Sequence, residues 1–382
     1  MDIDQRYPCV EDMKEGARRR VPRFAYDYLV GGIGKGDCLQ RNRQDLDDTL
    51  LMPRYLIDAS KPDFRCNVLG KTYDAPFGVA PIGLSGLIWR GSEKMLATAA
   101  KKHNIPYILS TFANESLERI RPVGGENAWF QFYPPNNRAM EDDIIKRTRN
   151  AGYEVMVVTI DIPVGTRRDH DIRNGLSIPP KIGLNTIRQC AARPTWSLQA
   201  LIHGIPDFEN MSPYYGAGAT LEQSAQFVTN TMTGHITAER IKRIRDVWPG
   251  KMLVKGVLDL EDARGYLAQG ADGLVISNHG GRQLDGAPSA ASVLPHLRQQ
   301  LGDDVLLMAD GGVRTGLDIA RMIALGANFV LMGRPFMYAV SALGARGADH
   351  VMTVLKEEFH MTMAQLGARS LGDLPGTLFQ KD

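Results

Sequence analysis

The segment Gly273-Leu274-Val275-Ile276-Ser277-Asn278-His279-Gly280-Gly281-Arg282-Gln283-Leu284-Asp285 joins a short apolar run to a group of polar residues. The run 273–276 lies between glycine and aspartate residues, which predicts a strand buried on both faces. The chemistry begins where this strand ends. A histidine changes protonation near neutral pH, and an arginine offers a planar fork of donors to a carboxylate. One histidine beside two glycines is more often an ordinary loop residue. The nine consecutive residues 277–285, mostly polar residues and glycines, predict a site.

Seven further apolar runs precede helical stretches in the same way, so a strand and a helix alternate eight times along the chain. The predicted strands cover residues 77–80, 107–109, 129–132, 155–159, 252–254, 274–277, 305–309 and 329–332. Strands this continuously apolar fit a parallel sheet covered by helices. The pattern predicts one α/β domain over 1–382: a single (β/α)8 TIM barrel at about 76–345, preceded by an N-terminal helical arm at 1–75.

Polar residues or glycines lie at the C-terminal end of each predicted strand, where barrel enzymes carry their catalytic groups, and at the first strand Pro81 and Ile82 lead to such a glycine. These residues are Pro81, Ile82, Gly83, Ser110, Thr111, Gln131, Tyr133, Thr159, Asp161, Lys255, His279, Asp310 and Gly333. The last two strands also predict a phosphate site. Gly311 and Gly312 allow a close approach of the backbone to a ligand, and Arg314 and Arg334 can each pair with a phosphate. A phosphate site alone also serves aldolases and isomerases.

Composition and spacing exclude several classes of protein. The 45 Lys and Arg residues nearly balance the 43 Asp and Glu residues, which gives no argument for nucleic acid as a partner. The four cysteines show no CxxC or metal-ligand spacing, so we expect free thiols in a reducing compartment and no metal. No apolar run reaches the length of a membrane span, and the N-terminus lacks the pattern of a secretion signal. We therefore expect a cytoplasmic protein, with peripheral contact at the inner face of the membrane left open.

Three segments lie outside the rhythm of strands and helices. Residues 10–29 are predicted to form one helix that ends at a glycine pair, while 33–71 is predicted to be a wrapping arm rather than a core element. The rhythm lapses at about 179–233, and a loop this long is usually a lid, an interface or a disordered segment. Within it, 196–202 is predicted to be a short amphipathic helix that packs on a neighbouring surface or docks on a membrane. The chain is expected to end in helices through residue 363 and a loose tail.

Over residues 7–374 the chain resembles the FMN-dependent 2-hydroxy-acid-oxidising family, which includes glycolate oxidase, lactate and mandelate dehydrogenases, and the flavin domain of flavocytochrome b2. The nonapeptide 277–285 is close to the signature of that family. The resemblance implies that His279 is the active-site base and that Arg282 holds the substrate carboxylate. An aromatic-Asp-Tyr run before a glycine pair is a second family motif. It implies that Tyr28 reaches over the flavin to the substrate carboxylate.

The resemblance implies FMN as the cofactor and assigns residues from all eight strand ends to it. The residues expected to contact the flavin ring are Pro81, Ile82, Gly83, Ser110, Gln131, Thr159 and Ser277. Lys255 is expected beside flavin N1 and O2, where a positive charge stabilises the reduced anion. The residues expected to hold the ribityl chain and the phosphate are Asp310, Gly311, Gly312, Arg314, Gly333 and Arg334. No GxGxxG motif follows a first strand, which argues against a nicotinamide cofactor.

The remaining implied roles concern the substrate. Asp161 is expected to place its carboxylate against His279 and to stabilise the imidazolium, although an aspartate after a strand by default caps a helix or a turn. Arg168 and Arg282 are expected to clamp the substrate carboxylate, and Tyr133 to hydrogen-bond the substrate hydroxyl. The histidine takes a proton either from the hydroxyl, as hydride leaves Cα, or from Cα itself. The sequence leaves both routes open.

Several positions depart from the glycolate-oxidising members, which carry threonine, alanine, tryptophan and leucine where this chain has Ile82, Gly83, Phe112 and Gly165. Phe112 and Gly165 match the pocket-wall positions and predict room for a mandelate-like or longer-chain (S)-2-hydroxy acid. Gly165 is almost equally well explained as a turn residue beside Pro163. Gly83 resembles the mandelate dehydrogenases. Together with the long 179–233 loop and the missing haem domain, it predicts a quinone or electron-transfer protein as the electron acceptor.

Other functions stay open at this point. An oxygen-using oxidase that produces hydrogen peroxide would share the motifs of the site. Lys255 at a strand end could also be the Schiff-base nucleophile of a lyase on the same phosphate-binding barrel. A flavin-binding protein without activity is disfavoured because every expected catalytic position is filled. The family usually forms tetramers, so we expect a homotetramer.

Overall fold

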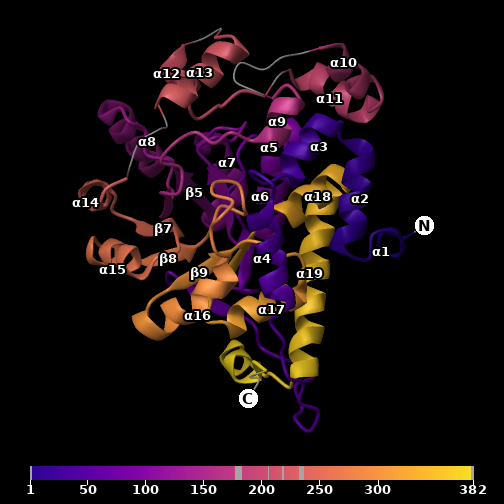
Figure 1. The fold of residues 1–382 in the computed structure, drawn as a ribbon, viewed down its shortest axis with the longest axis vertical. Helices are drawn as coiled ribbons and strands as arrows, with labels where there is room; N and C mark the ends of the chain where they lie inside the picture. Colours follow the sequence, from indigo (N-terminus) through magenta and orange to yellow (C-terminus); the bar gives the residue numbers. More distant parts are fainter. Residues whose placement is uncertain (1, 177–182, 205, 217–218, 232–235, 380–382) are drawn as a thin grey trace.

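Eight parallel strands close into a barrel in the spatial order β10-β3-β4-β5-β6-β7-β8-β9, which confirms the predicted (β/α)8 fold (Figure 1). The strands are β3 (Phe77–Val79), β4 (Tyr107–Ser110), β5 (Ala128–Phe132), β6 (Val155–Thr159), β7 (Lys251–Val257), β8 (Gly273–Ile276), β9 (Leu307–Asp310) and β10 (Phe329–Met332). Each coincides with a predicted run to within a few residues. The computed structural model describes residues 2–176, 183–204, 206–216, 219–231 and 236–379.

The strands are mostly apolar because the barrel separates two hydrophobic cores, and polar members such as Gln131, Lys255 and Asp310 lie toward their C-terminal ends. Val275 of β8 belongs to the core inside the barrel, together with Met308 of β9 and Leu253 of β7. Its chain neighbours Leu274 and Ile276 belong to the larger core between the strands and the outer helices. Alternate side chains of a strand point to opposite faces of a sheet, so both faces of β8 require apolar residues.

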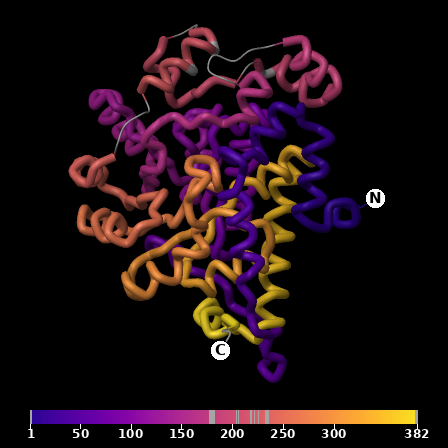
Figure 2. The backbone as a smooth tube through the Cα atoms, viewed as in Figure 1, coloured from indigo at the N-terminus to yellow at the C-terminus, as the bar shows by residue number. Residues whose placement is uncertain are grey.

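A helix follows each strand and covers the outside of the barrel (Figure 2). These helices are α6 (Ser92–Lys102), α7 (Leu117–Gly124), α8 (Arg138–Asn150), α14 (Ala238–Val247), α15 (Leu260–Ala268), α16 (Ala290–Leu301), α17 (Gly316–Ala324) and α18 (Arg334–Leu343). Most begin with a side chain that accepts a hydrogen bond from the first turn, as Thr315 does at α17. Such a cap fixes the residue at which the loop from the preceding strand ends.

A short antiparallel hairpin closes one end of the barrel. It consists of β1 (Cys66–Val68) and β2 (Lys71–Tyr73). The ring of Tyr73 contacts those of Trp129 and Phe329, with centroids 6.2 and 6.1 Å away. Both partners lie near the N-terminal ends of their strands, so the C-terminal end of the barrel is left for a site.

The N-terminal arm contains α1 (Ile3–Arg6), α2 (Val10–Arg20), α3 (Arg23–Val30) and α4 (Asp37–Asp47). The prediction of one helix over 10–29 is wrong, because Val21 has the extended angles φ −97° and ψ 139° and Pro22 precedes α3. A residue before proline is biased away from helical angles. The prediction that 33–71 lacks a core element is wrong for α4, which buries Cys38, Asn42 and Leu46.

The two ends of the chain pack onto the same side of the barrel. Helix α2 lies along α18, which in turn packs on the long helix α19 (Ala345–Leu366) (Figure 2). The expected loose tail is instead tied to the arm. After the short helix η2 (Leu371–Thr377), Leu378 bridges to Leu51, and the carbonyl of Thr377 accepts a hydrogen bond from the N–H of Met52 at 2.6 Å.

The described part of the long 179–233 segment after β6 covers the C-terminal end of the barrel, and it is built of helices (Figure 1). After α9 (Asp169–Arg173) it forms α10 (Leu184–Ala191), α11 (Pro194–His203), α12 (Ser212–Tyr215) and α13 (Leu221–Thr231). The predicted helix at 196–202 is confirmed within α11. Residues 179–182, 205, 217–218 and 232–233 lie outside the described residues.

One tryptophan anchors α11 to the body of the protein. Nε1 of Trp196 donates to the carbonyls of Leu87 and Ile88 in α5 (Ser85–Ile88), at 3.2 and 3.1 Å. Its ring also meets that of Phe24 edge to face at 5.6 Å. Considering the described residues alone, we find no helix with both the length and the apolar character that crossing a membrane requires.

Candidate active site

His279 and Asp161 meet above the ends of β8 and β6. Nδ1 of His279 lies 2.9 Å from Oδ1 of Asp161, and Nε2 lies 3.4 Å from the hydroxyl of Tyr133. Burial alone would raise the pKa of Asp161, but the attraction of His279 and Lys255 lowers it below its ordinary value. Asp161 is therefore an anion that can stabilise a proton on the imidazole.

Burial also raises the pKa of Tyr133 well above its ordinary value. Its hydroxyl therefore keeps its proton near neutral pH and can donate a hydrogen bond to a ligand oxygen. The ring stacks on Phe112, with centroids 5.0 Å apart and planes inclined by 28°. This contact fixes the direction of the hydroxyl toward His279.

Gly256 gives Asp161 the room to reach His279, and the sequence analysis missed it. It has φ +104° in β7, beside a register shift between Lys255 and Val257. A Cβ on Gly256 would lie 2.6 Å from the Cβ of Asp161. A glycine inside an apolar strand pattern signals a bulge or a close approach, so the run Val254-Lys255-Gly256 carried a usable signal.

Lys255 lies at the end of β7 between acceptors. Its Nζ is 3.0 Å from Oδ2 of Asp310 and 2.7 Å from Oγ of Ser277. Burial lowers the pKa of Lys255, but Asp310 and Asp161 raise it to a value above the ordinary one. A Schiff-base nucleophile needs an unprotonated amine, so this environment disfavours the lyase and suits a permanent cation.

Tyr28 and Arg282, which lie far apart in the sequence, come together at one side of the site. The guanidinium of Arg282 stacks on the ring of Tyr28 at 4.7 Å from its centroid. Arg282 also donates to the carbonyls of Tyr28 and Gly31, at 2.8 and 3.1 Å. The C-terminal end of α3 thus fixes the arginine of the nonapeptide.

Three arginines create a positive potential within the site. Burial lowers the pKa values of Arg282 and Arg314, and burial with repulsion from both of these arginines lowers the pKa of Arg334 to about 9. Arg334 donates hydrogen bonds to the carbonyls of Leu29, Gly31 and Gly280. The positive charges of these arginines repel one another, and a bound anion would stabilise them. The cluster therefore fits a phosphate and a carboxylate.

The site also fits a hydroxylated ligand of the size of FMN. A cavity of about 1080 Å³ opens at the C-terminal end of the barrel. Oδ1 of Asp310 is buried there without a hydrogen-bond partner among the described residues, as an acceptor awaiting a ligand hydroxyl would be. Gly311 and Gly312 have φ +104° and +82°, so the loop after β9 brings bare backbone to the cavity.

The structure brings together all the residues that the sequence analysis assigned to the site. Those that line the cavity are Tyr28, Pro81, Ile82, Gly83, Ser110, Phe112, Tyr133, Thr159, Gly165, Arg168, Lys255, His279, Arg282, Asp310, Gly311, Gly312, Arg314, Gly333 and Arg334. The other three lie directly behind this lining. Gln131 bonds Ser110 and Thr159, each at 3.0 Å, while Ser277 and Asp161 bond Lys255 and His279 as described above.

The lining of the cavity includes an aromatic pair and a glycine without close neighbours. Phe208 meets Phe112 edge to face at 5.6 Å, and both line the cavity. No described atom lies within 4 Å of the position that a Cβ on Gly165 would take. Gly165 has no positive φ, so the conformational freedom of glycine is not needed for a turn there.

The segments that cover the barrel also contribute to this cavity, which the strand pattern does not predict. The cavity is lined by Ile172 of α9, by Val228 of α13 and by Phe208, which precedes α12, all from segments without an apolar strand pattern. Asp171 also lines it and pairs with Arg168 at 3.8 Å. The three-residue spacing of these two charges was the available signal, because such residues lie on one face of a helix.

The chain is similar to proteins of known activity over nearly its whole length. A family described as FMN-dependent dehydrogenase matches residues 17–381. An L-lactate dehydrogenase from Pseudomonas syringae pv. syringae (strain B728a) is 36% identical over 371 residues, which make up 97% of each chain. The solved structure of the monotopic membrane protein (S)-mandelate dehydrogenase superposes with a TM-score of 0.93 at 35% identity, covering 98% of this chain and 99% of that chain. A mandelate oxidase variant with (S)-mandelic acid superposes with a TM-score of 0.80 at 31% identity, covering 96% and 97%.

Proposed function

Because the chain belongs to the FMN-dependent dehydrogenase family, whose members resembling it oxidise 2-hydroxy acids, we propose that its substrate is an (S)-2-hydroxy acid with an aromatic or long aliphatic side chain. The observation that carries this proposal is that the aromatic pair of Phe112 and Phe208 lines the same cavity as Gly165, where a Cβ would meet no described atom within 4 Å. Each additional buried CH₂ group of a substrate stabilises the complex by about 0.8 kcal/mol. Glycolate has no side chain to place there, whereas mandelate has a phenyl ring.

We further propose that Arg168 and Arg282 bind the substrate carboxylate, with Tyr28 beside them. Nε of Arg168 is buried and has no hydrogen-bond partner in the part of the chain that the structure describes, so it is available to a ligand. Two guanidinium groups can fix a carboxylate in position and orientation. Substrate Cα is then held near His279.

In this proposal, His279 accepts the proton that the substrate loses, either from its hydroxyl group or from Cα. Tyr133 donates its hydroxyl hydrogen to the substrate oxygen, and Nε2 of His279 accepts a proton from the substrate. Asp161 holds the other ring nitrogen and stabilises the resulting imidazolium through its charge. FMN, when bound, supplies the two-electron oxidation.

The residues proposed to hold FMN come from the whole rim, so 1–382 would work as one FMN-binding domain. Arg314 and Arg334 take the phosphate, and Gly311, Gly312 and Gly333 let the backbone approach it. Asp310 takes ribityl hydroxyls through its unpartnered oxygen, and Lys255 supplies a positive charge beside the ring. Residues 81–83 lie along the ring, and Ser110 and Thr159 hydrogen-bond its edge. Gln131 and Ser277, expected at that edge too, support it from behind the cavity lining through Ser110, Thr159 and Lys255.

We propose a quinone or an electron-transfer protein as the acceptor of electrons. The support is the likeness to an L-lactate dehydrogenase and to (S)-mandelate dehydrogenase, together with Gly83. The likeness to a mandelate oxidase keeps oxygen as the alternative acceptor. Re-oxidation after anaerobic reduction distinguishes them in a stopped-flow experiment: a quinone should accelerate it strongly, and fast re-oxidation in air without a gain from quinone would favour the oxidase.

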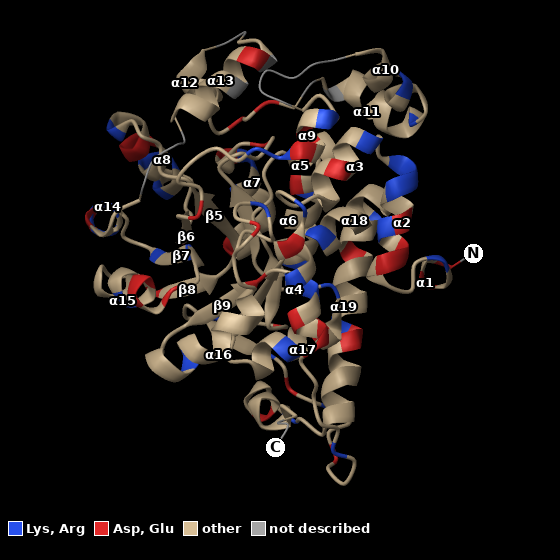
Figure 3. Ribbon diagram, viewed as in Figure 1, with Lys and Arg blue, Asp and Glu red and all other residues tan. Residues whose placement is uncertain are grey.

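We propose that α10 and α11 make peripheral contact with a membrane. The apolar residues Leu184, Ile187, Leu198, Leu201 and Ile202 are between 58% and 82% exposed. Helix α11 carries no Lys, Arg, Asp or Glu, as its tan ribbon shows, while Arg188 and Arg193 lie close by in the chain (Figure 3). An apolar face beside basic residues suits an anionic lipid surface. The likeness to a monotopic membrane protein supports this proposal.

Vesicle sedimentation tests the membrane contact. The protein should sediment with vesicles containing anionic lipid, and Leu201→Asp combined with Ile202→Asp should abolish this while leaving turnover of a soluble acceptor intact. Equal sedimentation of the wild type and this variant would contradict the contact. The homotetramer implied by the family resemblance remains a proposal that light scattering of the purified protein can test.

A further inference from the structure

The loop that carries His279 has a backbone conformation that something must hold in place. His279, Gly280 and Gly281 have φ values of +58°, +64° and +74° in succession. Positive φ is uncommon for a residue with a side chain, and it persists when the surroundings determine it. The base of the proposed reaction therefore depends on groups that fix the loop.

Asn278 fixes the loop from its first residue. Its Oδ1 accepts from the N–H of Gly281 at 3.2 Å, and its Nδ2 donates to the carbonyl of Pro288 at 2.9 Å. The Asn278 side chain thus connects Gly281, the last residue of the turn, to Pro288 farther along the chain. Asn278 is only 5% exposed, so these hydrogen bonds are sheltered from water.

Asn42 of α4 holds Asn278 through a reciprocal pair of hydrogen bonds. Nδ2 of Asn42 donates to Oδ1 of Asn278 at 3.0 Å, and Nδ2 of Asn278 donates to Oδ1 of Asn42 at 2.8 Å. Asn42 is 1% exposed. Two buried amides that satisfy each other in this way admit one relative orientation, so the pair sets the position of the turn.

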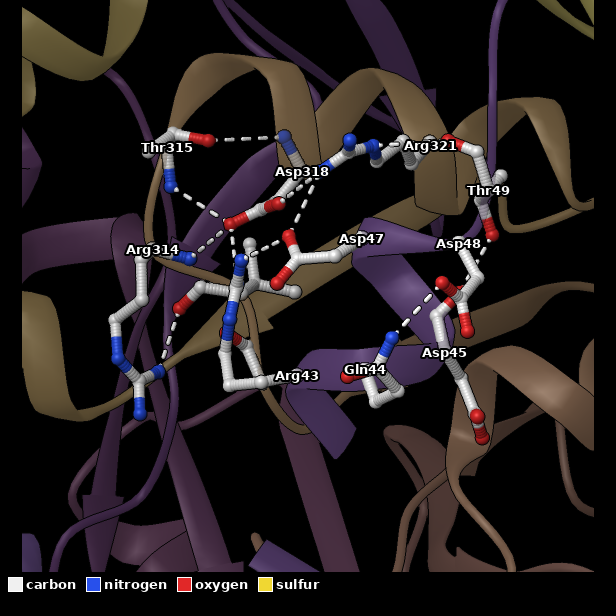
Figure 4. A network of polar contacts seen from close by, with 12 residues as sticks. Arg43, Gln44, Asp45, Asp47, Asp48, Thr49, Arg314, Thr315, Asp318 and Arg321 are labelled. Atoms are coloured by element: carbon white, nitrogen blue, oxygen red, sulfur yellow. Dashed lines mark hydrogen bonds and ion pairs between the residues drawn. The ribbon is translucent and has the colours of Figure 1, made fainter. Parts of the chain in front are cut away.

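The next residue of α4, Arg43, holds the neighbouring loop after β9. Its Nη1 donates to the carbonyl of Gly312 at 2.7 Å and to Oδ2 of Asp318 at 2.6 Å. The same Asp318 oxygen accepts from the backbone N–H groups of Arg314 and Thr315, at 2.9 and 3.2 Å. Figure 4 shows Arg43 and Arg321 converging on Asp318 beside this loop.

The two loops also pack tightly on α4 itself. A Cβ on Gly312 would lie 2.2 Å from the carbonyl oxygen of Asn42, and one on Gly281 would lie 2.8 Å from the backbone nitrogen of Leu39. Both glycines have positive φ. Helix α4 therefore lies against both loops and contributes a polar side chain to each.

We propose that α4 is the positioning element of the active site, in which Asn42 positions the His279 loop and Arg43 positions the Gly311–Arg314 loop. This inference rests on the proposed roles of His279 as base and of the 311–314 loop as phosphate ligand. Asn42 and Arg43 touch neither substrate nor reacting atoms, so each acts through another residue. Adjacent residues of one helix then control different properties: Asn42 the chemical step and Arg43 the affinity for FMN.

The experiment compares Asn42→Ala and Arg43→Met with Gln44→Ala, a control at the next position of α4. Gln44 is exposed and bonds Asp48 within its own helix. For each protein loaded with FMN, kcat and KM are measured with (S)-mandelate at saturating artificial acceptor. The Kd of FMN is measured separately from the quenching of flavin fluorescence on titration into protein freed of cofactor, and folding is checked by circular dichroism and Tm.

Asn42→Ala should lower kcat at least tenfold while KM and the Kd of FMN change less than threefold. Arg43→Met should raise the Kd of FMN at least tenfold, while kcat at saturating FMN stays within threefold, and Arg43→Lys should recover part of the affinity. Gln44→Ala should match the wild type in all three quantities. These outcomes together would support the inference.

The inference is overturned if Asn42→Ala and Arg43→Met change the same quantities in the same proportion, or if either variant matches the Gln44→Ala control. A loss of Tm in both variants without a change in kcat or in the Kd of FMN would also overturn it, because α4 would then serve stability alone. Failure of the proposed function shows separately, as a wild-type protein that (S)-2-hydroxy acids do not reduce.

Discussion

Oδ1 of Asp161 lies 2.9 Å from Nδ1 of His279, and this contact leaves the other ring nitrogen facing Tyr133 and the cavity. The carboxylate thereby selects the orientation of the imidazole as well as stabilising its protonated form. Because the pKa of Asp161 is held below its ordinary value, Asp161 carries a negative charge beside the imidazole.

Asp161→Asn should lower kcat by about 10- to 150-fold, which corresponds to the roughly 1.5–3 kcal/mol of a hydrogen bond to a charged group. FMN affinity should not change, because Asp161 lies behind the cavity lining. The measurement is anaerobic reduction of the bound flavin by (S)-mandelate. A reduction rate equal to that of the wild type would show that the carboxylate takes no part in proton transfer.

Gly256→Ala, in β7, should also slow the proton transfer to His279. The new Cβ would have to displace Asp161, and the φ of +104° at this position is unfavourable for alanine. We expect kcat to fall by an amount similar to that of Asp161→Asn, with a lower Tm. Gly265→Ala is the control, since no described atom would crowd its Cβ and alanine favours helix α15. If both glycine variants behave alike, the room beside Asp161 is not limiting.

Most of the barrel and the rim could be predicted because strand periodicity and strand-end residues are local signals. A run of buried apolar residues such as Leu274, Val275 and Ile276 is recognised without knowledge of distant contacts, and the C-terminal end of each strand follows from the topology. Helix α4 could not be found in this way. It is largely polar, and its importance comes from Asn42 and Arg43 meeting loops more than two hundred residues away in sequence.

The covering helices show the same limit. Phe208 and Val228 reach the cavity only because the segment after α11 folds back over the rim, which depends on tertiary contacts such as that of Trp196 with α5. The break between α2 and α3 could have been predicted from the sequence. Pro22 follows Val21, and a residue before proline is biased away from helical angles.

Gly165→Leu should weaken the preference for large substrates. In the wild type, kcat/KM should be higher for (S)-mandelate and longer aliphatic 2-hydroxy acids than for glycolate. The leucine side chain would occupy the open space and erase much of this preference, while Gly165→Ala should have a smaller effect. A panel of substrates assayed with one artificial acceptor gives the ranking. Glycolate as the best wild-type substrate, or an unchanged ranking in the leucine variant, would contradict the pocket argument alone.

The buried carboxylate of Asp318 should make stability depend on acidity. Burial alone would raise its pKa, but Arg43 and the N–H of Arg314 lower it below its ordinary value. A carboxyl group with a depressed pKa in the folded state stabilises the fold above its unfolded pKa of about 3.9, and this contribution is lost as the pH falls through the folded pKa.

Asp318→Asn should therefore lower Tm at pH 7, in line with a cost of about 1–3 kcal/mol for leaving buried donors unpaired. The difference in Tm from the wild type should stay constant above about pH 5 and shrink as the pH falls below about 4. Differential scanning calorimetry across this range, with the exposed Asp304→Asn as a control, measures it. A difference in Tm between the wild type and Asp318→Asn that grows as the pH falls would contradict the lowered pKa of Asp318.

The most direct test of the account is the rate at which (S)-mandelate bleaches the bound flavin of His279→Gln in the absence of oxygen. The variant should remain yellow, because the Gln side chain leaves the phosphate and ring contacts intact. Its bleaching should be slower than that of the wild type by about 10²–10⁴-fold, the usual contribution of a general base. Bleaching of the variant at the wild-type rate would contradict the assignment of His279 as the base.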